Sequence, residues 1–458
     1  MSNLNPAIFK MYDIRGIVAT DLTPDTVRLV GQAFANECLK QNVNEVCIGR
    51  DGRLHSKALS VALTEGLNAG GCDVIDVGMV PTPVLYFATH HLKTGTGIMV
   101  TGSHNPPEYN GLKMSMAGKT LYGDDITAFY TAIEAGDLNT GTGSYREQSV
   151  LDEYFERIVS DIKLEHKMKI AVDCGNGVAG VIATKLFKAL GCEVTELFCD
   201  VDGNFPNHHP DPSKLENLKD ICASIEKNNL ELGLAFDGDG DRVGVIDNLQ
   251  KVIWPDRQMI LYSEDVLSRE PGALIIYDVK SSYNLGKEIT KMGGEPLMWM
   301  TGHSLIKAKM KETHAALAGE MSGHIFFKER WYGFDDGLYS AARMLEILSK
   351  KSGTSAEIFA ALPDSCNTPE IQINFAEGEH HAFMKKFKTN AKFENADIST
   401  IDGMRVTWDK GWGLIRPSNT TPCLVLRFEA EDENSLAEVQ KQFREQILAT
   451  DDSIELGF

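Results

Sequence analysis

Three aspartates at alternate positions are the first group that could do chemistry. Asp237-Gly-Asp-Gly-Asp241-Arg242 follows an apolar stretch. In an extended chain alternate side chains point to one side, so Asp237, Asp239 and Asp241 can meet at one cation while the glycines let the backbone turn. Such oxygen ligands suit Mg²⁺ and leave coordination positions for phosphate oxygens. Arg242 and Asn248 stand where an EF-hand needs Gly and Glu, and a merely solvated turn would gain nothing from three repelling charges.

A second run, Thr101-Gly-Ser-His-Asn-Pro106, follows another apolar stretch and ends in Asn-Pro, which favours a turn. We therefore expect a loop to present Ser103, rather than regular structure to bury it. Serine is a weak nucleophile, but a phosphoserine is a phosphoryl donor whose developing charge a metal can neutralise. A lone serine is more often a cap or turn residue, yet His104 and Lys113 nearby favour a function. No G-x-S-x-G elbow supports a hydrolase.

Two further loops carry groups that bind sugars and phosphates. Gly319-Glu-Met-Ser-Gly-His324 places Glu320 and Ser322 on one side of an extended segment, where they could bind neighbouring sugar hydroxyls. The alternative is a buried Glu and His with structural partners, although the glycines allow close approach of a ligand. Arg416-Pro-Ser-Asn-Thr-Thr-Pro422 has the composition of an oxyanion-binding turn.

Cations lie beside glycine-rich or loop-like segments in a chain whose formal net charge is -20. They predict a local basic pocket that attracts a small dianion. These residues are Arg15, Lys113, Arg242, Lys280, His303 and Arg416.

One motif suggests a different class of protein. Gly175-Asn-Gly-Val-Ala-Gly180 fits the dinucleotide pattern G-x-G-x-x-G, and Glu196 lies near the position of a ribose-binding acid. Because the motif sits in one of three similar repeats and nothing else indicates hydride chemistry, a nicotinamide-dependent oxidoreductase stays a lesser alternative.

The elements that would position these loops form an internal repeat. One order of landmarks recurs three times: an apolar run ending near an Asp, a Gly-led strand, and a strand that enters one of the unusual loops. Strands alternating with helical stretches predict βαβ units and mainly parallel sheets, in which ligands bind at the carboxyl ends of the strands. The first landmarks are 46–51, 170–173 and 274–278, the second 71–77, 191–198 and 293–300, and the third 97–100, 232–236 and 315–318.

The chain changes character after about Pro363. A strand over 370–375, a basic helix over 381–388 and a closing helix over 434–448 predict a smaller α+β unit. Four units agree with 458 residues, because domains usually hold about 100 to 200.

Composition restricts the partners and the compartment. The acidic balance argues against nucleic acid and anionic membranes, which need a basic surface. No apolar run approaches the roughly 20 residues that cross a bilayer. Nine scattered cysteines and a polar start predict a cytoplasmic protein with reduced thiols. We expect a monomer or a small homo-oligomer.

The signatures TGSHNP, DGDGDR, GEMSGH and RPSNTTP, in this order over essentially the whole chain, resemble those of the α-D-phosphohexomutase superfamily. The resemblance is to its bacterial phosphomannomutase/phosphoglucomutase branch. Met321 favours this branch, because phosphoglucosamine mutases usually carry Gln there. The resemblance implies three related mixed-sheet α/β domains and a C-terminal α+β domain like TATA-binding protein, around a central cleft. We expect domains at 1–148, 149–251, 252–363 and 364–458, carrying the phosphoserine, metal, sugar and phosphate loops in turn.

The resemblance also implies roles for individual residues. Ser103 would be the phosphorylated serine and, with Asp237, Asp239 and Asp241, would hold Mg²⁺. Glu320 and Ser322 would bind the sugar 3- and 4-hydroxyls. Around the transferring phosphoryl group it places Arg15, His104, Lys113, Arg242 and His324, with Lys113 and His324 as candidate acid/base groups. Around the other phosphate it places Arg416, Ser418, Asn419 and Thr420, helped by Tyr12, Lys280 and His303.

The implied reaction interconverts hexose 1-phosphate and hexose 6-phosphate through a hexose 1,6-bisphosphate, which also serves as activator. The bisphosphate turns around in the cleft, so one site accepts two opposed orientations. Recognition through the 3- and 4-hydroxyls ignores C2, where glucose and mannose differ, so both sugars are expected. A phosphoglucosamine mutase and a non-catalytic phosphosugar-binding protein stay open as alternatives.

Overall fold

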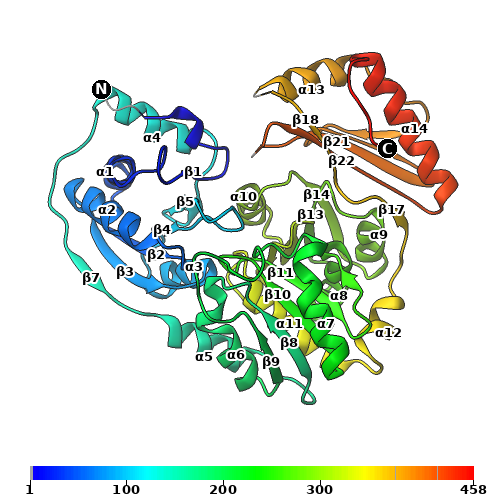
Figure 1. The fold of residues 1–458 in the computed structure, drawn as a ribbon, viewed down its shortest axis with the longest axis horizontal. Helices are drawn as coiled ribbons and strands as arrows, with labels where there is room; N and C mark the ends of the chain where they lie inside the picture. The colour runs from blue at the N-terminus through cyan, green and yellow to red at the C-terminus, as the bar shows by residue number, and fades with distance from the viewer. Residues whose placement is uncertain (1–3, 377, 420) are drawn as a thin grey trace.

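Four β-sheets follow one another along the chain. The structure, a computed structural model, describes residues 4–376, 378–419 and 421–458. The first unit lies on the left of Figure 1, the second and third below and to the right, and the fourth, in orange and red, at the upper right. This arrangement confirms the predicted fold class of three α/β units and one α+β unit, whereas the exact domain limits stay a prediction.

The first three sheets repeat one topology. In the centre of each sheet, the strand of the first landmark lies between the strands of the third and second landmarks. The orders are β4-β2-β3, β10-β8-β9 and β15-β13-β14, and all of these strand pairs are parallel. In each sheet the next strand, β5, β11 or β16, pairs antiparallel with the third landmark. The three unusual loops are therefore equivalent reversals at the carboxyl ends of parallel strands.

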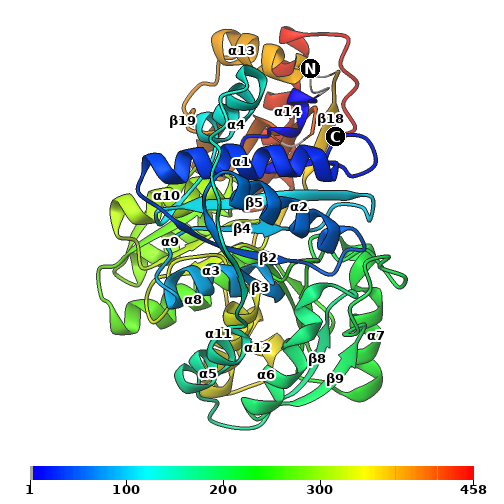
Figure 2. The same ribbon diagram turned by 90° about the vertical axis from the view of Figure 1, so that its left-hand side faces the viewer.

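The first unit is a 7-stranded sheet with helices on its faces (Figure 2). Its longest helix begins after Thr23, whose hydroxyl accepts from the Thr26 N–H, and Pro24 starts the first turn. The elements are η1 (Pro6–Ile8), β1 (Ile14–Ile17), α1 (Pro24–Lys40), β2 (Glu45–Arg50), α2 (Ser56–Ala69), β3 (Asp73–Met79), α3 (Thr82–His91), β4 (Gly97–Val100), β5 (Tyr109–Met116), β6 (Lys119–Thr120), α4 (Asp124–Ala135) and β7 (Tyr145–Glu147).

The second unit is a 5-stranded sheet in the order β12-β11-β10-β8-β9. All five residues of its central strand β10 are buried, as expected for an apolar run inside a sheet covered on both faces. The elements are α5 (Leu151–Asp161), β8 (Lys169–Asp173), η2 (Val178–Val181), α6 (Ala183–Ala189), β9 (Glu193–Leu197), η3 (Leu215–Leu218), α7 (Lys219–Asn228), β10 (Leu232–Phe236), β11 (Val243–Asp247) and β12 (Val252–Ile253).

The third unit is a 4-stranded sheet in the order β14-β13-β15-β16. Asp336 caps its buried helix α11 by accepting from the Tyr339 N–H, and Thr354 and Glu357 form a capping box on α12. The elements are α8 (Pro255–Arg269), β13 (Leu274–Asp278), α9 (Tyr283–Lys291), β14 (Glu295–Trp299), α10 (His303–Thr313), β15 (Leu317–Gly319), β16 (Ile325–Phe327), α11 (Gly337–Lys350) and α12 (Ser355–Ala360).

The fourth unit is a 6-stranded antiparallel sheet with two helices on one side (Figure 1). The expected strand, basic helix and closing helix are all present, and the RPSNTTP run joins β21 to β22. The elements are β17 (Cys366–Asn367), β18 (Ile371–Asn374), α13 (Glu379–Asn390), β19 (Asp397–Ser399), β20 (Met404–Trp408), β21 (Gly411–Pro417), β22 (Cys423–Ala430) and α14 (Glu433–Thr450).

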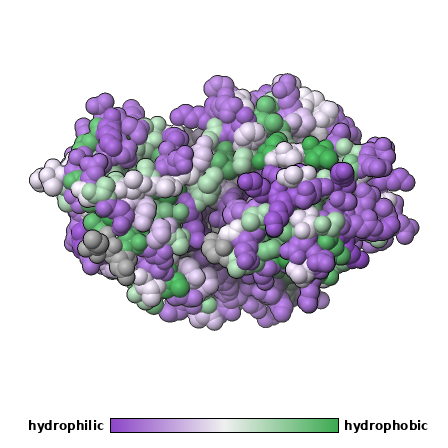
Figure 3. Space-filling model, turned by 90° about the horizontal axis from the view of Figure 1, so that it is seen from above, coloured by the Kyte–Doolittle hydropathy of each residue, from purple (hydrophilic) through white to green (hydrophobic). Residues whose placement is uncertain are grey.

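The cores divide the molecule unevenly. One large apolar cluster joins the first three units, with members such as Val84, Ile170 and Leu338. The fourth unit has a separate core, and among the described residues a small apolar cluster, Val279, Trp412 and Leu414, joins it to the third unit. Seen from above, the surface is hollowed between the first and fourth units, and the residues that border the hollow range from hydrophilic to weakly hydrophobic (Figure 3). Among the described residues no helix is long and apolar enough to span a bilayer.

Candidate active site

Ser103 lies in the reversal between β4 and β5, as predicted, but it is only 1% exposed. A turn, and not regular structure, holds the serine as predicted, and the 237–241 loop of the second unit covers that turn. The backbone of Ser103 has φ 49°, in the left-handed region, a strain that persists only where surrounding contacts impose it. Gly238 makes the cover possible, since a Cβ there would lie 2.2 Å from the Ser103 carbonyl oxygen.

Two residues that sequence reasoning did not assign hold this loop. The carboxylate of Asp51, at the end of β2, accepts from the Thr101 hydroxyl at 2.8 Å and the Gly102 N–H at 3.1 Å. The guanidinium of Arg53 donates to the carbonyl of Ser103 at 2.8 Å and to three more carbonyls, of Asn105, Pro106 and Tyr109. Both side chains are almost fully buried. The first landmark of the repeat, which ends at Asp51, was the available signal.

The three aspartates meet, but through a turn. Asp237, Asp239 and Asp241 offer carboxylate oxygens that all lie within 4.8 Å of one another, and all three residues are fully buried. The sequence analysis assumed an extended segment, but in the structure the chain reverses through Gly240, whose φ is 73°. The Ser103 hydroxyl donates to Asp237 Oδ2 at 3.2 Å, so serine and carboxylates from two units share one site.

The chemistry of the trio fits a divalent cation. Within the described residues, Asp239 Oδ1 and Asp241 Oδ1 are buried oxygens without a hydrogen-bond partner. Burial and the charges of Asp241 and Asp239 raise the pKa of Asp237 well above its usual range. The trio therefore holds more negative charge than its protein neighbours compensate, which a hard cation with oxygen ligands would correct.

Cations surround the serine and the trio. Lys113, from β5, donates to Asp239 Oδ2 at 2.7 Å and to Asp241 Oδ2 at 2.5 Å; burial disfavours its charge, but these aspartates outweigh burial and raise its pKa. Arg242 Nη2 lies 3.4 Å from the Ser103 hydroxyl and also contacts His104 Nδ1. Burial and Arg242 hold the pKa of His104 well below its ordinary value, so this imidazole is neutral.

Arg15 lies one step further from the serine. It donates to Asn105 Oδ1 at 2.5 Å, within the serine loop, and forms an ion pair with Asp13. Its charge also contributes to the low pKa of His104. The structure thus brings Arg15 to the serine loop without a direct contact to Ser103.

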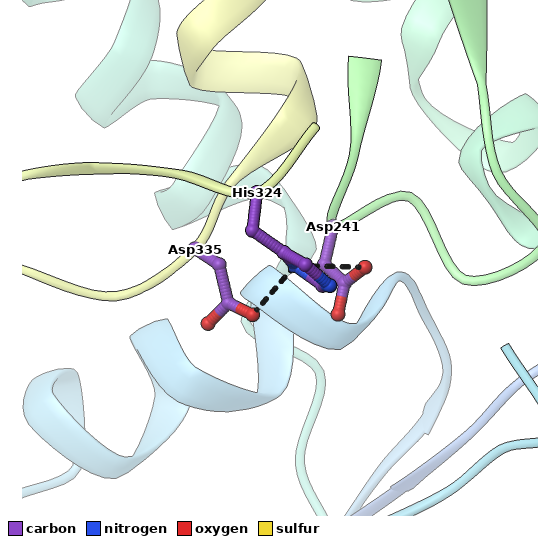
Figure 4. A group of neighbouring side chains, drawn as sticks. All are labelled: Asp241, His324 and Asp335. Atoms are coloured by element: carbon purple, nitrogen blue, oxygen red, sulfur yellow. Dashed lines mark ion pairs between the residues drawn. The ribbon is translucent and has the colours of Figure 1, made fainter. Parts of the chain in front are cut away.

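His324 joins the metal loop to the third unit (Figure 4). Its Nδ1 lies 3.6 Å from Asp241 Oδ1 and 3.1 Å from Asp335 Oδ2. The fully buried Asp335, which sequence reasoning did not assign, also pairs with Lys307 at 2.8 Å and lies 3.8 Å from His303 Nδ1. Only its place in the chain next to the cap of α11 distinguishes Asp335, and that is no signal for a contact with His324.

The predicted sugar-binding pair is assembled on the third unit. The Ser322 hydroxyl donates to Glu320 Oε2 at 3.0 Å, and the Gly302 N–H donates to Oε1 at 2.6 Å. Burial raises the pKa of Glu320. Gly302 precedes His303 at the start of α10, so the hydrogen bond from Gly302 holds Glu320 and Ser322, here called the hydroxyl clamp, close to His303.

The predicted phosphate loop lies across the cleft, and no contact joins it to Ser103 within the described residues. Asp402 accepts from Arg416 Nε at 2.9 Å. The Ser418 hydroxyl lies 3.0 Å from that of Thr421. Tyr12, from the first unit, donates to the Thr301 carbonyl at 2.9 Å and also contacts the Asn419 amide.

Two further predictions concern this region. Lys280 donates to Glu370 Oε1 at 2.6 Å, beside the start of β18, so it faces the fourth unit as expected of a phosphate ligand. Thr420 lies outside the described residues.

The glycine motif at Gly175–Gly180 has a packing role. The Val178 N–H donates to the Gly238 carbonyl at 3.1 Å, so the motif supports the metal loop. The carboxylate of Glu196, the candidate ribose-binding acid, pairs with Lys188 at 2.7 Å on the exposed surface. Neither observation favours a nicotinamide site.

Family models match four consecutive parts of the chain. They are the phosphoglucomutase/phosphomannomutase alpha/beta/alpha domains I, II and III, at residues 6–140, 152–250 and 254–366, and the C-terminal domain of the same family at residues 370–446. Together these matches span nearly the whole chain.

Individual relatives agree with the family models. A phosphomannomutase/phosphoglucomutase of Pseudomonas aeruginosa is 53% identical over 455 residues, covering 99% of this chain and 98% of the relative. A phosphoglucomutase of Neisseria meningitidis is 50% identical over 448 residues, covering 97% of each. A crystal structure of a phosphoglucomutase/phosphomannomutase family protein from Burkholderia thailandensis superposes with a TM-score of 0.94 at 51% identity, covering 99% of this chain and 100% of the other. On these matches and on a four-sheet fold that unites serine and aspartate loops, the chain belongs to the phosphoglucomutase/phosphomannomutase family.

Proposed function

We propose that the chain interconverts hexose 1-phosphates and hexose 6-phosphates by way of a phosphoryl group carried on Ser103. The observation that carries this proposal is the 3.2 Å contact between the Ser103 hydroxyl and Asp237, which brings a nucleophile from the first unit to the acidic trio of the second. Relatives that share about half of the sequence and are named phosphomannomutase/phosphoglucomutase support the same reaction class.

In the first half-reaction, the phosphoryl group on Ser103 Oγ passes to the free hydroxyl of the bound hexose phosphate. The bond between phosphorus and Oγ breaks, a bond to the sugar oxygen forms, and the hydroxyl proton leaves to a base. Lys113 and His324 are the candidate acid/base groups: Lys113, which the aspartates keep charged, can only give a proton, so His324 is the candidate for the base. Arg242, which contacts the Ser103 hydroxyl, would compensate the charge that develops on the phosphoryl oxygens.

In the second half-reaction, the hexose 1,6-bisphosphate turns and offers its other phosphate to Ser103. The Ser103 oxygen attacks that phosphorus, the bond to the sugar oxygen breaks, and the proton returns to that oxygen. The hydroxyl clamp of Glu320 and Ser322 and the remote loop at Arg416 suit this reversal, because neither touches the reacting end of the sugar. Added bisphosphate would act as activator by charging an unphosphorylated Ser103.

A divalent cation, which we propose to be Mg²⁺, would be held by Asp237, Asp239 and Asp241 and by an oxygen of phosphorylated Ser103. When bound, it would supply positive charge to the transferring phosphoryl oxygens. The unpartnered buried oxygens of Asp239 and Asp241 support this assignment.

Both glucose and mannose phosphates are proposed substrates, because the clamp at the 3- and 4-hydroxyls makes no contact with C2, where the two sugars differ.

We also propose domain limits near residues 148, 251 and 363. The nine cysteines are all free in the described residues, which supports a reducing, cytoplasmic location.

The test is a mutase assay on mannose 1-phosphate, glucose 1-phosphate and glucosamine 6-phosphate, with Mg²⁺ and catalytic bisphosphate, combined with intact mass. We expect turnover of the first two and a protein species heavier by one phosphoryl group. Ser103→Ala should lose both the extra mass and the activity, whereas Ser453→Ala, in the exposed C-terminal turn, should keep both. Faster turnover of the glucosamine ester would indicate a phosphoglucosamine mutase, and binding of NADH without a need for Mg²⁺ would overturn the proposal.

A further inference from the structure

Lys280 already has an anionic partner in the structure. It lies in the turn after β13 and is 7% exposed. Its ammonium donates to Glu370 Oε1 at 2.6 Å. Glu370 belongs to the segment just before β18, and its side chain is 37% exposed. The pair thus joins a buried cation of the third unit to an accessible carboxylate of the fourth.

Further cations lie near the Glu370 carboxylate. Lys280 lowers the pKa of the Glu370 carboxyl, and Arg427 and Arg416 lower it further, against the effect of burial. Arg416 is itself paired with Asp402. A carboxylate therefore lies beside Lys280 and near Arg416, two cations that are predicted to bind the non-reacting phosphate.

A carboxylate and a phosphate compete for the same donors. Both accept charge-assisted hydrogen bonds from an ammonium, and a phosphate dianion carries the larger charge and more acceptor oxygens. The Glu370 side chain is partly exposed, so it can turn into solvent, and the arriving phosphate then replaces it as the partner that the buried Lys280 requires. Lys280 is buried and cannot move away with it.

We propose that Glu370 is a built-in competitor of the substrate phosphate, holding Lys280 in the free enzyme and yielding it when the non-reacting phosphate arrives. This inference rests on the proposed function of Lys280 as a phosphate ligand. Glu370 touches no reacting atom in this scheme; it sets the affinity of the phosphate site.

A lowered affinity suits a reaction whose intermediate must turn. The bisphosphate has to release one phosphate from this site and then place the other there. Tight binding of the bisphosphate as a ground state would deepen the well that it must leave, so it would slow turning without helping phosphoryl transfer. The Glu370 carboxylate would favour that release by forming its ion pair with the Lys280 ammonium again as the phosphate departs.

The first experiment replaces the charge and keeps the shape. In Glu370→Gln, we expect KM for glucose 1-phosphate and the dissociation constant for inorganic phosphate, measured by calorimetry, to fall about fivefold, as for the loss of one partly exposed ion pair. Glu438→Gln is the matched control, because Glu438 also pairs with a lysine, Lys441, at 3.7 Å, but on the exposed face of α14. It changes the net charge equally and should change neither constant.

A double substitution tests whether Glu370 acts through Lys280. Lys280→Met should weaken phosphate binding, and adding Glu370→Gln to it should give no further tightening. The inference is overturned if Glu370→Gln leaves both constants at the control value, raises them, or tightens binding equally without Lys280. Because phosphate binding needs no turnover, tighter binding in a protein without mutase activity would support the competitor and sink the proposed function alone.

Discussion

The serine–metal region and the phosphate-loop region are built in different ways. Ser103, the aspartate trio and His324 lie on loops of three units that share one apolar cluster. The predicted phosphate loop lies on a unit with its own core, joined to the third unit by a small apolar cluster and by buried polar contacts. Arg405 donates to the carbonyls of Val279 and Ser281 in the third unit, and Glu429 accepts from Ser282 of that unit and, within the fourth unit, from Trp412.

The two regions differ in how rigidly they need to hold their ligand groups. Phosphoryl transfer needs reacting groups held to fractions of an ångström, which an apolar core shared by three units can provide. A phosphate site that serves both orientations of a bisphosphate needs less rigidity. Because the apolar cluster at this junction is small in the described residues, a displacement of the fourth unit would expose little apolar surface. Four substitutions would break or sharpen this contrast.

The largest effect should come from the metal loop. Asp241→Asn is expected to reduce kcat by roughly a thousandfold, because several kcal/mol of charge stabilisation depend on the cation that the trio would hold. The measurement is kcat together with Mg²⁺ affinity by calorimetry. Asp220→Asn, on α7, is the control. An unchanged dependence on Mg²⁺ would remove the trio from the site.

The next effect should come from the support of the serine loop. Arg53→Met removes a buried cation that binds four carbonyls, so we expect a loss of about 3–5 kcal/mol in unfolding free energy and a lower kcat. Arg53→Lys should restore part of the stability but little of kcat, since an ammonium cannot reproduce the fork. Denaturant unfolding and steady-state kinetics separate the two. If both variants kept normal kcat, the loop would not need this support.

A smaller and different effect is expected at the junction of the fourth unit. Glu429→Gln weakens the contacts to Ser282 and Trp412 and should raise KM about tenfold while changing kcat little. The ratio of the two constants is the measurement, with Glu431→Gln, in the exposed turn after β22, as control. A fall in kcat with constant KM would contradict the division of tasks.

The smallest effect on activity belongs to an ion pair far from the cleft. Despite burial, hydrogen bonds from Arg269 and the charge of Arg343 lower the pKa of Asp265 from 3.8 to about 2. A depressed pKa contributes stability above pH 4, and this contribution disappears as the pH falls towards 2. Asp265→Asn should therefore be less stable than the native chain at pH 7, with the difference shrinking between pH 4 and pH 2. Thermal unfolding across that range measures it, and a constant difference would refute the assignment.

The sequence predicted what local pattern and repetition encode. The three landmarks, the strand-end loops and the RPSNTTP hairpin follow from periodicity and composition, and equivalent loops had to meet at equivalent sheet edges. Residues that act through distant contacts escaped prediction. Arg53 holds a loop some fifty positions away, and Asp335 reaches His324 from a separate segment. Such partners depend on how the units pack against one another, and a local stretch of sequence carries no information on that packing.

If Ser103 carries the phosphoryl group as proposed, its near-complete burial bears on the lifetime of that phosphoserine. Bulk water is a competing acceptor for any phosphoryl donor, and a serine that solvent barely touches denies it a route of attack. Hydrolysis should accordingly be slow between encounters with sugar. A molecule charged once would then remain ready through many idle periods, and scarce bisphosphate would suffice to keep the whole population active.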